Sequence, residues 1–227
     1  MPALRAADLL RSVAEAVPAS GASASRRRYR EEALALVRGE GLLAAAIVWR
    51  IVALDAPAGE ILRAGGEEFV APRLLPEAGR LTALACGVAT IGPAIEGRVR
   101  ALFAERRAAL AVALDELGNA LLMVASRRVQ DRIFAEAKRR GLTMAGELRP
   151  GDPGLGLAAQ VPLLRLADAA SIGVDLSSGL ALRPLKSTSM VLGVGVDLPP
   201  ARWSRCDDCP TAPRCKLAPH RPATAAA

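Results

Sequence analysis

The feature that most constrains the fold is a long apolar stripe between residues 108 and 140. Apolar residues recur there every three or four positions, from Leu110 to Ala137, and charged residues occupy the opposite side. This period is typical of an α-helix with one apolar face. Gly141 follows at the position where helices commonly end. The segment therefore predicts one long amphipathic helix.

The amino-acid composition limits the classes of protein to which a chain with this helix can belong. The chain has 227 residues, enough for one large domain or two small ones, and 52% of them are hydrophobic. Only 3% are aromatic, which argues against a base-stacking platform for single-stranded nucleic acid. The net charge of +7 comes from scattered arginines, densest at residues 25–30. We interpret that cluster as the solvated start of a helix, with contact to an anionic partner as the alternative.

The N-terminal residues and the cysteines indicate in which cellular compartment the protein is expected. Residues 1–18 form an amphipathic pattern without the apolar centre of a signal peptide. The longest uncharged stretch, Leu81–Ile95, is shorter than the roughly 18 residues that span a bilayer. Three of the four cysteines crowd near the C-terminus, which favours a metal or redox site over a disulfide framework. We therefore expect a soluble, cytoplasmic protein that does not enter a membrane.

The rest of the chain reads as helices first and then strands mixed with helices. Residues 60–75 are ambiguous and can be a helix broken at Gly65-Gly66, with residues 69–75 extended because Pro72 and Pro76 exclude a helix there. This order predicts an α+β domain with an antiparallel or mixed sheet. We divide the chain into an N-terminal helix and linker (1–28), an α+β domain (29–198) and a cysteine-rich tail (199–227). Helices are expected over 4–17, 29–37, 42–54, 93–105 and 157–169, and strands over 81–92, 143–148, 172–176 and 181–198.

A loop dense in turn-forming residues follows the expected strand 143–148. Two prolines and three glycines fall within residues 150–156, and such a run cannot continue a helix or a central strand. Glycine allows close backbone approach to a ligand, and proline stiffens the loop. A strand with Lys186 and several hydroxyls comes later. Together they can hold a small polar ligand, or they can simply be two tight turns in a sheet.

A series of short motifs in a fixed order carries a family resemblance. Between about residues 30 and 195 the chain resembles the activation domain of vitamin B12-dependent methionine synthase and its stand-alone relatives. The motifs are Thr90-Ile91-Gly92, Leu102-Phe103, Leu114-Asp115, Gly118-Asn119-Ala120, the Pro-Gly loop with Leu157 and Gln160 behind it, Ile172-Gly173-Val174, Leu176, and Pro184-x-Lys186-Ser187-x-Ser189.

The resemblance implies both a fold and an activity. The fold is a single C-shaped α+β domain with a central antiparallel or mixed sheet flanked by helices. The ligand is S-adenosylmethionine, in a shallow groove beside the Pro-Gly loop. The role is reductive reactivation, in which cob(II)alamin is reduced by one electron and then methylated by S-adenosylmethionine. The chain lacks the Asp-x-His-x-x-Gly stretch of B12-binding domains, so cobalamin is expected on a partner.

The resemblance also implies ligand-binding residues. Arg149 and loop amides, including those of Gly151 and Gly154, are candidates for holding the ligand carboxylate. An acidic side chain would pair with the ligand ammonium, and Asp115 matches the helix aspartate of the family. Each candidate also has a purely structural interpretation. Arg149 can extend into solvent, the glycines can simply form turns, and Asp115 can cap the helix or form an ion pair. The motif residues Lys186, Ser187 and Ser189 also match the family, although strand hydroxyls commonly bond to backbone.

The loop departs from the family at one position. The family carries a Gly-Tyr pair whose aromatic ring lies near ligand and cobalamin. The equivalent here is Gly151-Asp152 or Gly154-Leu155, and the chain's one tyrosine is Tyr29. This departure favours a protein that kept the fold and gave up the ligand.

The C-terminal tail carries the candidate metal ligands. Cys206, Cys209 and Cys215 follow a Cys-x2-Cys-x5-Cys spacing. Thiolates at this spacing suit zinc or an iron–sulfur cluster. His220 would complete a zinc site, and Cys86 would complete either a zinc site or an iron–sulfur cluster. A cysteine in an apolar strand, however, is commonly buried in the core. A cluster would suit electron delivery to cobalt, whereas zinc would serve folding.

Three functions remain open from the sequence. The first is an accessory reactivation protein for a B12-dependent methionine synthase or related corrinoid methyltransferase, presenting S-adenosylmethionine. Its partners would be a cobalamin-carrying methyltransferase or a split methionine synthase, together with a flavodoxin-like or ferredoxin-like electron donor. The second is a non-enzymatic metal-binding interaction protein. The third, a nucleic-acid adaptor, is disfavoured by scattered charge and few aromatics. No catalytic residue is expected, because the single histidine excludes a Ser-His-Asp triad.

Overall fold

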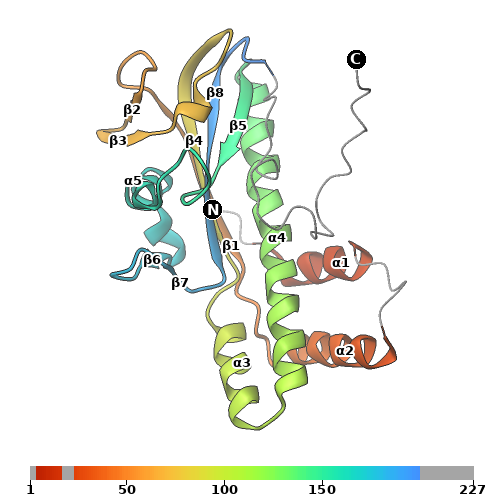
Figure 1. The fold of residues 1–227 in the computed structure, drawn as a ribbon. Helices are drawn as coiled ribbons and strands as arrows, with labels where there is room; N and C mark the ends of the chain where they lie inside the picture. Colours follow the sequence, from red (N-terminus) through yellow and green to blue (C-terminus); the bar gives the residue numbers. More distant parts are fainter. Residues whose placement is uncertain (1–3, 17–22, 200–227) are drawn as a thin grey trace, which may run out of the picture.

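A four-stranded antiparallel sheet forms the centre of the protein (Figure 1). The computed structural model describes residues 4–16 and 23–199. The strands lie in the order β1-β4-β8-β5. Their bounds are β1 Ala46–Ala53, β4 Arg80–Thr90, β8 Ser187–Val196 and β5 Thr143–Leu148. The sheet therefore joins strands from the beginning, middle and end of the described chain.

The long helix α4 packs along one face of this sheet (Figure 1). It runs from Ala108 to Arg139, and α3 (Ala94–Ala104) precedes it as the other arm of a helical hairpin. The helices α1 (Ala6–Ala16) and α2 (Ala24–Gly39) lie against α4 on the side away from the sheet. One continuous apolar core joins these helices to the α4-facing residues of β4 and β8.

The hydropathy of α4 reflects this packing. Among the described residues, α4 alone is long and apolar enough to pass a test for a membrane-spanning helix, but core helices of soluble proteins pass the same test. The side chains of its predicted stripe, such as Leu114, Leu121 and Val129, are 0% exposed. They face the sheet and the two N-terminal helices, so the stripe is accounted for by intramolecular burial.

The opposite face of the sheet is covered by short elements and a second core. Helix α5 (Gln160–Ala167) lies across the middle, between the 3-10 turns η2 (Leu157–Ala159) and η3 (Ala169–Ile172). Two small hairpins and one further turn complete this layer. They are β2 (Ile61–Ala64) with β3 (Glu67–Val70), β6 (Asp175–Leu176) with β7 (Leu182–Arg183), and the turn η1 (Pro72–Leu74).

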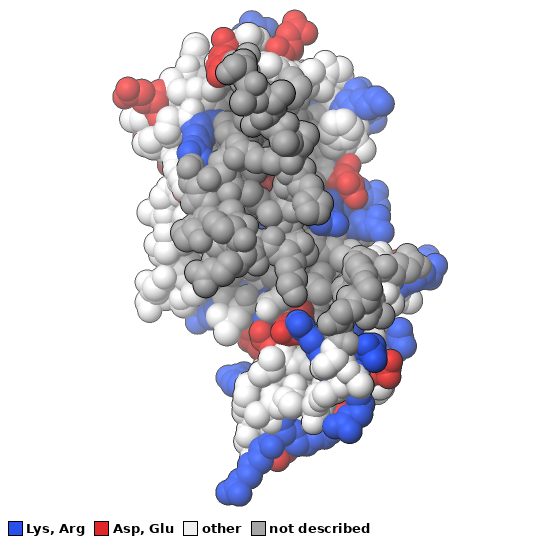
Figure 2. Space-filling model, turned by 45° about the vertical axis from the view of Figure 1, so that its right-hand side comes forward, with Lys and Arg blue, Asp and Glu red and all other residues white. Residues whose placement is uncertain are grey.

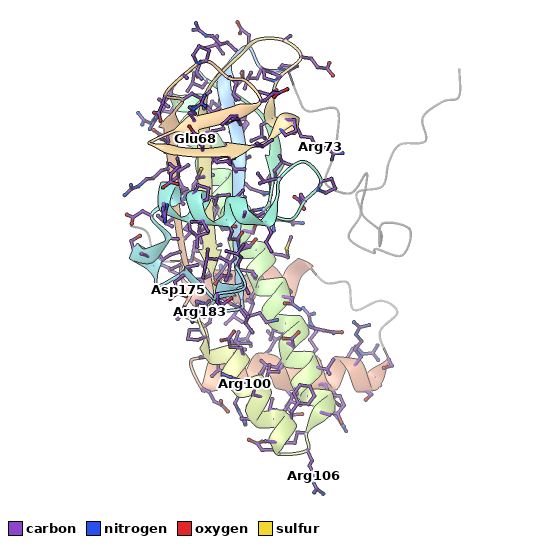
Figure 3. The ribbon with its side chains drawn as sticks, turned by 60° about the vertical axis from the view of Figure 1, so that its left-hand side comes forward. Glu68, Arg73, Arg100, Arg106, Asp175 and Arg183 are labelled. Carbon is purple, nitrogen blue, oxygen red and sulfur yellow. The ribbon has the colours of Figure 1, made fainter. Side chains whose placement is uncertain are left out.

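Surface ion pairs fasten both hairpins (Figure 3). Arg63 donates to Glu68 across β2 and β3 at 2.6 Å, and Arg183 donates to Asp175 across β6 and β7 at 2.8 Å. All four side chains are largely exposed, so each pair contributes at most about 1 kcal/mol. Figure 3 also shows Arg106, a left-handed residue, at the tip of the α3–α4 hairpin.

The α+β class with an antiparallel sheet is confirmed, and two local predictions are wrong. Residues 42–54 were expected to be helical, but residues 46–53 form β1. A short apolar run has no period that separates strand from helix, and pairing with β4 decides it here. The helix considered around Gly65-Gly66 is also wrong, because residues 61–64 and 67–70 are strands. Gly65 and Gly66, both with positive φ, form the tight turn between β2 and β3.

The arginine cluster is a helix start, as interpreted from the sequence. Helix α2 begins at Ala24, earlier than expected, and the Ser23 hydroxyl accepts a hydrogen bond from the Arg26 amide. Arg26 pairs with Glu116 of α4, and Arg30 donates to the carbonyl oxygen of Val13 in α1. Some of these arginines therefore hold α2 against its neighbouring helices.

Candidate functional site

Strand β8 divides the motif at residues 186–189 between the two faces of the sheet. Side chains alternate along a strand. Ser187 and Ser189 are buried on the α5 side, where Ser189 donates to the Gln160 side chain at 3.0 Å and Ser187 donates to Thr90 at 2.8 Å. Lys186 and Thr188 point to the α4 side. The four residues thus do not converge on one ligand position.

Lys186 bridges β8 to α4. Its Nζ lies 2.6 Å from Asp115 Oδ1 and donates to Asn119 Oδ1 at 2.6 Å. Asp115 and Asn119 are four residues apart and therefore share one side of the helix. Gly118 lies between them, and a Cβ atom there would be 3.4 Å from Lys186 Cε and 3.1 Å from Ile95. The glycine leaves room for the lysine side chain, which is only 12% exposed.

Arg149 lies where β5, β8 and α4 meet. Its guanidinium donates to Ser126 of α4 at 2.9 Å, Thr188 of β8 at 3.1 Å and Glu147 of β5 at 3.1 Å. The Glu147 carboxylate also accepts a hydrogen bond from Gln130 of α4. With 14% of its side chain exposed, Arg149 is a partly buried cation held by polar side chains from all three elements. Arg149 therefore does not extend into open solvent, which was the structural alternative.

The Pro-Gly loop is closed by its own hydrogen bonds. The amide of Gly151 donates to the Leu155 carbonyl, and the amide of Asp152 donates to the Arg149 carbonyl. The Asp152 carboxylate accepts from the Arg149 amide at 2.8 Å. Leu155 is 1% exposed and anchors the loop in the core. The amide of Leu155 donates to the Asp152 carbonyl, so three of the loop amides that were candidates for a ligand carboxylate are used within the loop.

The two loop glycines have different surroundings. Both have positive φ, +94° at Gly151 and +87° at Gly154, which L side chains rarely adopt. No heavy atom lies within 4 Å of a Cβ built on Gly151, whereas a Cβ on Gly154 would be 3.1 Å from the Arg73 stem. The loop thus needs both glycines for its turns, and Gly151 presents an open backbone surface beside Arg149.

The candidate residues of the α4 side form one polar strip. Polar residues of α4 spaced four, seven and four positions apart face polar residues of β5 and β8. We call this set the polar strip: Asp115, Asn119, Ser126 and Gln130 of α4, Glu147 and Arg149 of the β5 end, Lys186 just before β8, and Thr188 of β8. Asp115 and Ser126 are 11 residues apart on α4, so the Asp115 and Arg149 clusters are separated by about 16 Å along the helix.

Part of this strip was missed from the sequence. Ser126 is 0% exposed and interrupts the apolar stripe of α4, and this was a usable signal. Gln130 and Thr188 gave no comparable signal, because a polar residue on the surface of a helix or on a strand is commonplace. Only the crossing of α4 over β8 shows which polar residues meet.

The metal-binding predictions fall mainly outside the described part of the chain. Cys206, Cys209, Cys215 and His220 lie beyond residue 199. Within residues 4–16 and 23–199 no three His, Cys, Asp or Glu side chains group as metal ligands. Cys86 is 0% exposed in the middle of β4, and burial raises the pKa of its thiol to about 12. This confirms the interpretation of Cys86 as a buried core residue, and such a thiol is a poor metal ligand.

Basic side chains on the face in Figure 2 are dispersed among acidic ones. Several arginines form ion pairs with acidic side chains, such as Arg26 with Glu116 and Arg98 with Glu105. The hydrogen bonds that Arg98 donates to Glu105 and Glu40 raise its pKa further above the usual value. A nucleic-acid surface instead gathers unpaired cations on one face. The described residues on the face in Figure 2 do not have that arrangement.

Comparison with solved structures identifies the architecture. A structure entitled "Crystal Structure of the MetH Reactivation Domain bound to AdoHcy" matches 83% of this chain and 73% of its own, with a TM-score of 0.56 and 13% sequence identity. The chain has the reactivation-domain fold. No family model and no curated protein matches the sequence. The resemblance inferred from short motifs is thus confirmed at the level of the fold.

Proposed function

We propose that this chain is an accessory reactivation protein for a cobalamin-dependent methionine synthase or a related corrinoid methyltransferase. On this proposal it presents S-adenosylmethionine to a cobalamin carried by the partner. The observation that carries the proposal is the reactivation-domain fold, which in the similar structure holds S-adenosylhomocysteine, the product of methyl transfer from S-adenosylmethionine. The polar strip supplies charges of both signs on one side of that fold.

The polar strip fits the amino-acid end of such a ligand. That end carries one carboxylate and one ammonium. The two groups share one carbon atom, so a single cluster must hold both. Lys186 offers a cation for the carboxylate beside Asp115, 45% exposed, which offers an acceptor for the ammonium, and Arg149 with Glu147 offers the same two charges at the other cluster. The charged groups of each cluster already pair with one another, so binding exchanges one set of ionic contacts for another. The role of these residues is to bind and orient the ligand, and the methyl group and the cobalt supply the chemistry.

The proposal is tested by calorimetric titration of the purified chain with S-adenosylmethionine and S-adenosylhomocysteine. We expect saturable one-site binding for both, with a rise in melting temperature because ligand bound to the native state stabilises it. Adenosine, which lacks the amino-acid end, is the control and should bind more weakly. Absence of both heat and thermal shift at millimolar ligand would contradict the proposal.

A second candidate is a metal-binding interaction protein that has kept the fold without its ligand. The closed ion pairs favour it, because Arg149 with Glu147 and Asp115 with Lys186 satisfy one another without any ligand. The absence of a tyrosine from the Pro-Gly loop points the same way. The titration above separates the two candidates, since only the first requires S-adenosylmethionine to bind.

We also propose a metal site at Cys206, Cys209 and Cys215, with His220 as the remaining candidate ligand for zinc. Elemental analysis after anaerobic purification should find stoichiometric zinc or iron, and brown protein with visible charge-transfer absorbance would indicate a cluster. Cys209→Ser should lower metal content several-fold. The control Cys86→Ala should leave metal content unchanged, because Cys86 is enclosed in the core. Metal-free wild-type protein, or full metal in the Cys209→Ser variant, would contradict this site.

A further inference from the structure

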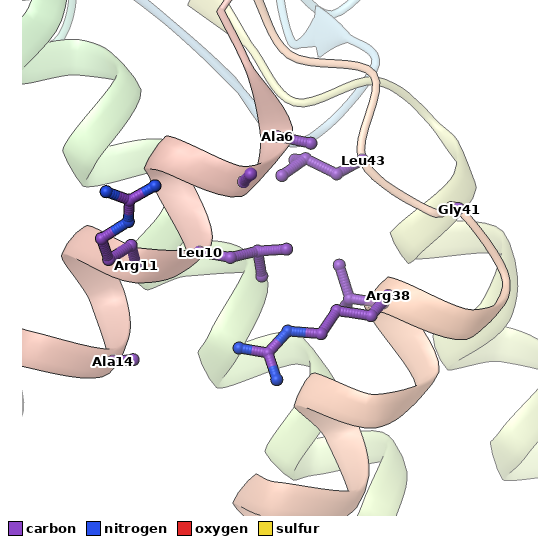
Figure 4. A pocket seen from close by; sticks show the side chains of 9 residues that line it. Ala6, Leu10, Arg11, Ala14, Arg38, Gly41 and Leu43 are labelled. Atoms are coloured by element: carbon purple, nitrogen blue, oxygen red, sulfur yellow. The ribbon is translucent and has the colours of Figure 1, made fainter.

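A cavity of about 600 Å³ lies between α1 and α2, among the helices outside α4 (Figure 4). Its walls come from small residues of α1 and from the end of α2 and the loop that follows. Leu10, Val37 and Leu43 give it apolar surface, and Ala14 lies at its α1 edge. None of the polar-strip residues lines it.

The side chains of α1 explain why the cavity stays open. Both helices pack on α4, and Arg30 of α2 ties them together at the C-terminal end of α1 through the Val13 carbonyl, at 3.0 Å. Toward the other end of α1 the residues that face α2 are mainly alanines, such as Ala6 and Ala7. Alanine methyl groups do not reach across to α2, so an apolar space is left where larger residues would interdigitate.

The charged residues that line the cavity in the described part of the chain are both positive. They are Arg11 of α1 and Arg38 of α2, and no acidic residue of that part lines it. Figure 4 shows the Arg38 side chain extending from α2 toward α1. Arg11 has only a 3.4 Å pair with Asp8, in which both side chains are more than half exposed, so the pair is weak. Within the described residues no hydrogen bond or ion pair engages Arg38.

We propose that this cavity binds a medium-chain acyl carboxylate. The volume falls in the range of small-molecule sites, roughly 300–1,000 Å³. The apolar surface accepts the chain, and the carboxylate lies at the rim, where Arg11 and Arg38 donate charge-assisted hydrogen bonds. A neutral chain would leave both arginines unused, and a cation would be repelled by them. This binding is independent of S-adenosylmethionine and of the polar strip.

The probe is decanoate, titrated calorimetrically into the full chain below its micellar concentration. One saturable site is expected, and decanol should bind about tenfold more weakly, since a charged hydrogen bond contributes that order of affinity. Arg38→Gln should also weaken decanoate about tenfold. Arg100→Gln, an exposed arginine on α3 shown in Figure 3, is the matched control and should bind as the wild type does.

A second variant tests the position of the acyl chain. Ala14 is exposed at the edge of the cavity, so Ala14→Trp fills the space without disturbing buried packing, and we expect loss of decanoate binding at an unchanged melting temperature. Several outcomes overturn the proposal: no decanoate binding to the wild type, equal affinity for decanol, or wild-type affinity in the Arg38→Gln or the Ala14→Trp variant.

Discussion

Replacing Gly87 with valine is expected to lower the free energy of unfolding by about 3 kcal/mol. Gly87 lies in β4 directly under α4. A Cβ atom at this position would be 2.4 Å from Val129 Cγ1 and 3.2 Å from Ile133 Cδ1. Both neighbours are 0% exposed and enclosed in the core, so they cannot swing away. The strand and the helix would have to separate, although valine itself favours strands.

Chemical denaturation of the variant measures this loss. The matched control is Gly97→Ala in α3, where nothing lies within 4 Å of the new Cβ. That change should stabilise the protein by about 0.5 kcal/mol, because alanine favours helix over glycine. A double variant of Gly87→Val with Val129→Ala should lose less than the sum of its single changes, since the second removes the clashing methyl groups. Wild-type stability of Gly87→Val would contradict the close crossing of α4 and β4.

Replacing Asp115 with asparagine is expected to weaken S-adenosylmethionine binding about tenfold. The change keeps the shape of the side chain and removes the charge that pairs with the ligand ammonium. A hydrogen bond to a charged group contributes about 1.5–3 kcal/mol, and 1.4 kcal/mol corresponds to tenfold in affinity. The asparagine still accepts a hydrogen bond from Lys186, so the fold should be retained.

The neighbouring carboxylate provides the control for that experiment. Glu116 is exposed and pairs with Arg26 rather than with the polar strip. Glu116→Gln removes the same charge from the same turn of α4, so general electrostatic attraction would be lost equally in both variants. Equal affinities for the two variants would show that Asp115 does not contact the ligand. Melting temperatures of both should stay within a few degrees of the wild type, which excludes unfolding as the cause.

Local sequence patterns located the elements that are amphipathic or sharply bounded. The stripe from Leu110 to Ala137 predicted α4 almost to its ends, because a helix of that length repeats its burial pattern many times. Strand β4 was located because a short apolar run ends at Gly92, where φ is +80°. Such signals lie within each segment and do not depend on the rest of the chain. The α+β class, with an antiparallel or mixed sheet, followed from their order.

The sequence could not locate elements whose conformation depends on a distant partner. Residues 46–53 are apolar except for Arg50, and they become a strand because β4 supplies the hydrogen bonds. The motif at residues 186–189 looked like one site, yet the strand period places Ser187 and Ser189 against α5 and its lysine against α4. That division follows from the pleat once the strand is buried on both faces.

The sequence by itself therefore determined the long helix, the turn-rich loop and the reactivation-domain architecture. Only the tertiary structure decided the surroundings of the candidate residues. Arg149 stands just before the loop in the sequence, but its partners Ser126 and Thr188 are 23 and 39 residues away. Charge and hydrogen-bonding capacity belong to a residue, whereas which partner satisfies them depends on how helix α4 crosses strand β8.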